Sequence, residues 1–262
     1  MRQRDLIPFF TMTFLIAWGI LGLYIFASET MVQLFGNLTG QHPLFYMAVY
    51  APAISALVLI FYRYKTQGMR LFLSRLLLWR ASIYWYVMLI LIVPLVFYLG
   101  ALIKPGALDT LFPFASITAY LSALFFMAIK GPIEEIGWRG LALPLLQRKM
   151  APIWAALLLG VVWAVWHLPA FMLSSTPQSA WALTPFLVGT LALSVIVTPL
   201  FNHSRGSLLL PAFFHLQLIN PLWPDAQPYD TWLFVVIAAV VVWFNRKTMF
   251  SRHNAVTEVL SK

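Results

Sequence analysis

The stretch IPFFTMTFLIAWGILGLYIFA, residues 7–27, runs without a charged side chain. A bilayer core needs about 20 apolar residues in a helix, so we interpret this run as a first membrane span. It lacks a convincing small-residue cleavage site, which argues against a cleavable signal peptide. Seven further apolar runs follow along the chain, at residues 43–62, 83–103, 113–147, 152–174, 181–202, 206–222 and 229–246.

The composition supports a membrane protein. Of the 262 residues, 61% are hydrophobic and 10% are charged, and the mean hydropathy is +0.84. Soluble domains contain about 45–50% apolar and about 25% charged residues. The absence of cysteine excludes disulfides and thiolate metal sites. The sequence therefore predicts an all-α fold, with residues 1–262 forming one polytopic membrane domain of about eight transmembrane helices in the lipid bilayer.

The fourth run, residues 113–147, is too long for one straight span. We expect a kink at Gly131-Pro132, because proline removes a backbone donor and clashes with the preceding turn.

The loop charges predict the orientation. The net charge is +9, but the basic residues sit in short loops and form no continuous patch, so we reject nucleic acid as a partner. Of the 17 Lys and Arg residues, 14 fall at the termini or in the alternate loops on the same side. Lys104 alone lies on the other side, and Lys130 and Arg139 lie within the fourth run. Because cytoplasmic loops carry the positive excess, we expect both termini in the cytoplasm, with the protein in a bacterial plasma membrane.

Several ionisable residues fall inside the apolar runs, where a charge costs about 2.5–3.5 kcal/mol on insertion scales. They are Lys130, Glu134, Glu135, Arg139, His167 and His215. We expect them to face the bundle interior and to neutralise one another. Glu135 and Arg139 are four residues apart and predict an ion pair. Glu134 is rotated by roughly 100° and is free to meet a histidine of another helix.

Other interpretations remain open for these residues. A buried network that only fixes helix packing is one, and Lys130 alone is interpreted as a snorkelling residue or local counter-charge.

Three motifs resemble those of a known family. Residues 131–140, GPIEEIGWRG, are similar to the EExxxR signature of the CPBP family of intramembrane proteases. That family includes type II CAAX prenyl endopeptidases and bacterial Abi and bacteriocin-processing proteins. Residues 163–169, WAVWHLP, resemble its FxxxH motif, with Trp163 in place of phenylalanine. Residues 207–220, SLLLPAFFHLQLIN, resemble its third motif, so the three motifs together cover residues 131–220.

The third motif departs from the family pattern. The family has asparagine four residues after the histidine, whereas here Ile219 holds that position and Asn220 follows. A straight helix would turn Asn220 away from His215. We therefore predict a π-type or unwound turn before Pro221 that brings Asn220 back.

The resemblance implies an intramembrane endopeptidase that acts on a membrane-associated or lipidated peptide or protein. Glu134 would activate water, and His167 would help to hold or deprotonate it. His215, with Asn220, would stabilise the oxyanion, while Glu135 and Arg139 would position this set. A His₂Glu zinc site formed by Glu134, His167 and His215 remains an equal alternative to a metal-free mechanism.

Two other classes of function also remain open. Buried Glu, His and Arg serve transporters and proton relays as well. A non-catalytic membrane scaffold or bacteriocin-immunity protein would accommodate the displaced Asn220. For access, His215 lies nine residues, or roughly 14 Å of helix, beyond Gly206. Gly206 is near the predicted cytoplasmic face, so we expect an active-site cavity that opens to the cytoplasm.

Overall fold

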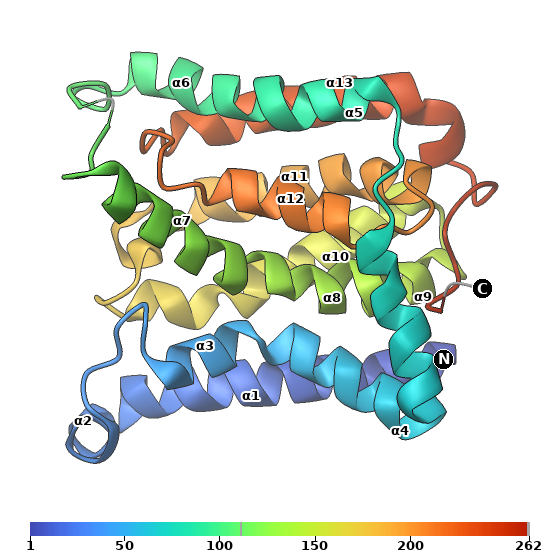
Figure 1. Ribbon diagram of the computed structural model, residues 1–262, viewed down its shortest axis with the longest axis horizontal. Coiled ribbons are helices and arrows are strands. Elements are labelled where there is room, and N and C mark those ends of the chain that lie inside the picture. Colours follow the sequence, from blue (N-terminus) through green and yellow to red (C-terminus); the bar gives the residue numbers. More distant parts are fainter. Residues whose placement is uncertain (111, 261–262) are drawn as a thin grey trace.

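The computed structural model describes residues 1–110 and 112–260, which form a helical bundle without a β-strand among them. The long helices lie side by side along one direction, and the two ends of the chain lie at the same end of the bundle (Figure 1). Arg148 links these ends directly. Its Nη1 donates to the Met1 carbonyl at 2.8 Å, and its Nη2 lies 3.2 Å from Glu258. The all-helical fold predicted from the apolar runs is thus confirmed.

The helices follow the predicted runs closely at most boundaries. They are α1 (Leu6–Phe26), α2 (Ser28–Phe35), α3 (Pro43–Val49), α4 (Ala51–Leu73), α5 (Ile83–Val87), α6 (Val93–Ile103), α7 (Ile117–Lys130), α8 (Glu135–Gly137), α9 (Leu143–Gln147), α10 (Pro152–Trp166), α11 (Leu183–His203), α12 (Leu209–Leu218) and α13 (Tyr229–Met249). Two π-helical segments, Met88–Ile92 and Trp138–Ala142, join α5 to α6 and α8 to α9.

Not every predicted run is a full-length straight span. Six helices among the described residues are long and apolar enough to cross a membrane, and the α3–α4 pair, bent by 63°, would add a seventh. The run expected at 206–222 contains only α12, whose 10 residues rise about 15 Å, roughly half of a bilayer core. The chain leaves helical geometry early at this run, after Leu218.

The long fourth run is interrupted where Gly131-Pro132 predicted a break. Helix α7 ends at Lys130, a 3₁₀ turn covers Pro132–Glu134, and α8 follows. A side chain at Gly137 is impossible without movement, because a Cβ there would lie 2.5 Å from the backbone of Pro52 in α4. The interrupted segment is therefore pressed against α4, while α7 has no buried residue and runs along the outside of the bundle (Figure 1).

The end of the bundle that holds the termini is tied together by one buried arginine. Arg75 lies in a 3₁₀ turn, Ser74–Leu77, and is only 2% exposed. Its Nε donates to the Gly206 carbonyl at 2.7 Å, and its Nη1 donates to the carbonyls of Gly140 at 2.8 Å and Val259 at 2.9 Å. The guanidinium joins the α8–α9 segment, the α11–α12 loop and the C-terminal tail.

Replacement of Arg75 should therefore destabilise the fold. Arg75→Ala leaves three buried carbonyls without their donor, and each unmade bond of this kind costs about 1–3 kcal/mol. We expect a clearly lowered Tm in detergent. Arg70→Ala, which removes an exposed arginine at the end of α4, is the control and should leave the Tm nearly unchanged. Equal Tm values for both variants would contradict this role of Arg75.

Candidate functional site

A cavity of about 440 Å³ brings together side chains from all three motifs. Glu134 comes from the 3₁₀ turn after α7, His167 from the end of α10, and His215 from α12. Asn220 also lines this cavity. The expected convergence of residues that are far apart in sequence is therefore present in the structure.

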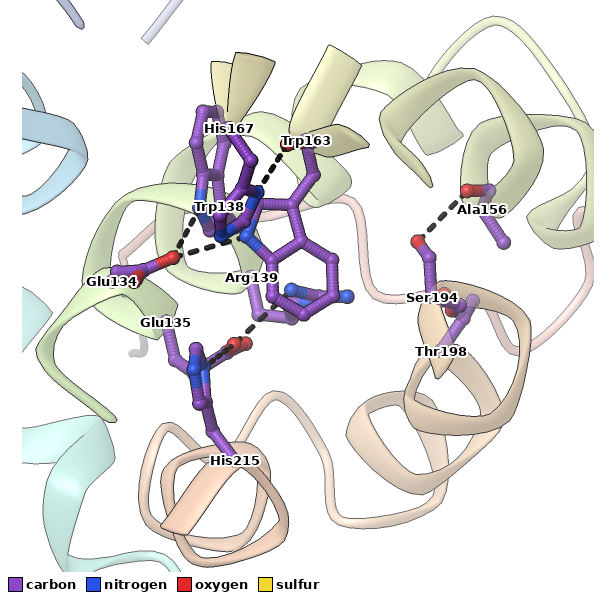
Figure 2. A network of polar contacts seen from close by, with 10 residues as sticks. All are labelled: Glu134, Glu135, Trp138, Arg139, Ala156, Trp163, His167, Ser194, Thr198 and His215. Atoms are coloured by element: carbon purple, nitrogen blue, oxygen red, sulfur yellow. Dashed lines mark hydrogen bonds and ion pairs between the residues drawn. The ribbon is translucent and has the colours of Figure 1, made fainter. Parts of the chain in front are cut away.

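Two tryptophans hold the Glu134 carboxylate. Trp163 Nε1 donates to Glu134 Oε2 at 3.0 Å, and Trp138 Nε1 donates to the same oxygen at 3.3 Å (Figure 2). Glu134 is only 4% exposed. Because an indole N–H can only donate, both contacts favour the charged carboxylate and fix its orientation. The second oxygen, Oε1, is left for another partner.

Glu135 connects the other charged groups. Arg139 Nη1 lies 3.1 Å from Glu135 Oε1, which is the ion pair that the four-residue spacing predicts. His215 Nδ1 lies 2.9 Å from the same oxygen (Figure 2). All three side chains are buried. The Glu135 carboxylate thus contacts both the Arg139 guanidinium and the His215 ring, and it orients that ring.

His167 lies where α10 ends and a 3₁₀ turn, Leu168–Met172, begins. Its Nδ1 is 2.7 Å from the carbonyl of Trp163, one turn earlier in the same helix. A carbonyl only accepts, so Nδ1 carries the hydrogen and a neutral ring keeps Nε2 as an acceptor. The Trp163 ring lies between the two histidines, with ring centroids 5.7 Å from His167 and 5.6 Å from His215.

Gly131 explains how α12 approaches the Glu134 segment so closely. A Cβ at this position would lie 2.9 Å from His215 Nε2 and 2.5 Å from the Ile219 side chain. Only glycine lets the ring of His215 reach the turn that carries Glu134. Close packing against α12 therefore explains the glycine at the start of the first motif.

The predicted unwinding before Pro221 is present. Helix α12 ends at Leu218, and Ile219 has the non-helical angles φ −116° and ψ 15°. The Asn220 side chain meets the Gln217 side chain at 3.4 Å and accepts from the Leu222 amide at 3.0 Å. Asn220 therefore reaches the cavity of His215, although its described hydrogen bonds go to its own chain neighbours.

The arrangement does not fit the zinc alternative. Among the described residues, no group of three or more His, Asp or Glu side chains is placed to hold a metal ion. No step of the chemistry below uses a metal.

Sequence reasoning overlooked the part played by tryptophan. The motifs assign no role to Trp138, and they identify Trp163 only as a replacement for phenylalanine. A useful signal was available, because Trp138 is one helical turn after Glu134. The interpretation of Lys130 also changes: it lines the cavity, and its Nζ lies 5.7 Å from the centre of the Phe45 ring.

The exposed part of the cavity lies away from Gly206, the residue from which the depth of His215 was counted. His215 lies three residues from the C-terminal end of the short α12, so the cavity extends beyond that end. The exposed residues of its lining are Pro177 and Asp225, in loops at the end of the bundle opposite both termini. The physical reason is the early end of α12, which a count from Gly206 does not reveal.

Comparison with known proteins agrees with these motifs. The sequence profile of the family described as type II CAAX prenyl endopeptidase Rce1-like matches residues 116–218, which include Glu134, His167 and His215. The chain is also 26% identical over 150 residues to CAAX prenyl protease 2 of Methanococcus maripaludis. That alignment covers 53% of this chain and 55% of the relative, so the chain spans about half the length of the curated relative that it matches.

The profile match covers the segment that carries the first two motifs and the histidine of the third. Over residues 116–218 the chain is therefore similar to the type II CAAX prenyl endopeptidases, in agreement with the CPBP-like motifs.

Proposed function

We propose that the protein is an intramembrane endopeptidase that hydrolyses peptide bonds of a membrane-associated or lipidated peptide or protein. One observation carries the proposal: the Glu134 carboxylate is fixed by two indole N–H groups in a cavity that it shares with His167 and His215. A scaffold has no need to hold a buried carboxylate in this way beside two histidines. The similarity to a CAAX prenyl protease of Methanococcus maripaludis supports the same reaction class.

The first step is the attack of water on the peptide carbonyl. Glu134 Oε1 accepts one proton of the water as the general base, because Oε2 is already engaged by the indoles. His167 Nε2 accepts the hydrogen bond of the other proton, since its Nδ1 hydrogen points at the Trp163 carbonyl. The water oxygen is thereby oriented before it forms the new bond to carbon.

The second step needs a donor for the oxyanion and a proton for the leaving amine. His215 protonated on both nitrogens donates from Nδ1 to Glu135 and from Nε2 to the oxyanion. The Asn220 side chain lines the same cavity and is placed to add a second donor to the oxyanion. Glu134 then returns its proton to the amine nitrogen as the C–N bond breaks.

The walls of the cavity suit an apolar substrate. Phe45, Phe97 and Phe186 line it, together with Trp181 and Trp223. Apolar walls with few polar groups are usual in sites that bind a largely hydrophobic ligand. A lipidated peptide or a hydrophobic peptide segment therefore fits the proposal.

The decisive variant is Glu134→Gln. It keeps the size of the side chain but removes the general base, and positioned acid–base groups typically contribute about 10²–10⁴-fold. We expect cleavage of a reconstituted peptide substrate, followed by mass spectrometry, to fall by at least that factor while the Tm stays near that of the wild type. Glu29→Gln, at an exposed glutamate of α2, is the matched control. Unchanged turnover would remove Glu134 from the mechanism.

Trp163→Phe tests the hydrogen bond to Glu134 without removing the ring. A hydrogen bond to a charged group contributes about 1.5–3 kcal/mol, so its loss predicts a kcat reduced by roughly 10–100-fold. Trp154→Phe changes an exposed tryptophan of the same helix and should have no effect. If Trp163→Phe is as active as the wild type, the indole does not orient the carboxylate.

Removal of metal ions provides a further test. The described side chains form no group able to hold a metal, so extensive treatment with a chelator should leave peptide cleavage unchanged. Metal analysis of the purified protein should accompany the assay. Loss of activity that zinc restores would instead favour a rearranged Glu134, His167 and His215 site.

A further inference from the structure

The mouth of the cavity lies at the end of the bundle that is remote from the termini. Its exposed lining residues, Pro177 and Asp225, belong to the loops before α11 and before α13. Glu134 and His215 lie at depth, and both are buried. None of its described lining residues belongs to the loops next to the termini or to the C-terminal tail. Water and substrate therefore reach the site from the end remote from the termini.

The opposite route is closed by packed side chains. Beneath the site the helices are tightly packed, since a Cβ at Gly140 would meet the Phe72 ring at 2.7 Å and Leu208 at 3.3 Å. Arg75 lies between the rings of Phe72 and Phe201, at 5.7 and 5.3 Å from their centres, and also binds the tail through Val259.

The C-terminal tail adds a second closure at this end. The Val256 carbonyl accepts from Gln147 at 2.8 Å, the Val256 amide donates to Asn202 at 3.0 Å, and Val259 is buried. The tail is thus seated across the bundle rather than hanging from it.

The charges at the two ends differ sharply. Of the 14 Lys and Arg residues that the sequence assigns to one side, the 13 that the structure describes lie toward the closed end. At the open end Lys104 pairs with Asp225 at 2.8 Å, and Lys130 lines the cavity. Three further carboxylates, those of Glu29, Asp109 and Asp230, also lie at this end. Because short basic loops stay in the cytoplasm, the closed end is the cytoplasmic one.

We propose that the cavity opens to the extracytoplasmic side, and that its substrates are peptide segments exposed on that face of the membrane. The substrate part rests on the proposed peptidase activity, whereas the direction of the opening does not. This assignment replaces the expectation of a site open to the cytoplasm. It follows from two independent features. The exposed lining residues of the cavity lie at one end of the bundle, and the basic residues lie at the other.

The opening can be tested with single cysteines, since the chain has none of its own. Asn37 and Ser175 are exposed at the open end, and Ser82 and Ser251 are exposed at the closed end. Each is replaced singly by cysteine. In intact bacterial cells that express the protein, a membrane-impermeant maleimide should label only the first pair. The second pair should react only after permeabilisation. The reverse pattern would overturn the proposal.

A cysteine inside the cavity tests whether the mouth is continuous with the site. Thr190 of α11 lines the cavity, whereas Ser194, one turn further, is buried and donates to the Ala156 carbonyl at 2.8 Å. A small impermeant cationic thiosulfonate added to intact cells should modify Thr190→Cys and spare Ser194→Cys. No modification of Thr190→Cys from outside, with modification in inverted vesicles, would contradict an outward opening.

The substrate side is tested with a membrane-impermeant fluorogenic peptide. Right-side-out vesicles should cleave it, and inverted vesicles should cleave it only after detergent is added. Cleavage confined to inverted vesicles would overturn the proposal. Expected cysteine labelling without cleavage in any preparation, detergent included, would leave the outward opening in place and remove the peptidase activity and its substrate.

Discussion

The need to bury charge without leaving it unpaired governs this structure. Glu135 lies at the centre of the cluster, where one carboxylate oxygen meets both Arg139 and His215. Removing one partner of a buried pair costs about 3–5 kcal/mol, because the remaining charge is left uncompensated. The helix of the first motif and α12 are therefore held in register by this oxygen. Glu134 takes no part in this ion-pair cluster. Its carboxylate accepts hydrogen bonds from two neutral indole N–H groups instead.

Irregular backbone supplies the geometry that regular helices cannot. The break after Lys130 and the early end of α12 border the cavity, and the π-helical segment Trp138–Ala142 begins one turn after Glu134. Backbone groups freed at such breaks need partners, which exist inside a membrane only in protein or in a polar cavity. The Gly140 carbonyl, within the π segment, is bonded by Arg75. The same arginine thus serves both the local backbone and the closure of one end of the bundle.

The two ends of the bundle differ in charge and in packing. One end is basic, tied by Arg75 and covered by the C-terminal tail, and it contributes rigidity. The other end is acidic, carries loops such as the one around Pro177, and leads to the site. The cavity does not extend to the basic end, because side chains of Phe72 and Leu208 pack closely around Gly140. This favours a hydrolytic site over a translocation path, which would need access from both sides.

Much of this architecture was determined by the sequence itself. The helical runs, the break at Gly131-Pro132 and the Glu135–Arg139 pair are local features, since each depends only on residues within a turn or within one span. The tertiary structure alone decided which helices meet. Trp163 holds Glu134 because α10 packs beside the first-motif helix, and the cavity faces away from the termini because α12 stops at Leu218. Hydrophobic periodicity records which side of a helix is buried, but it does not record which neighbour covers that side.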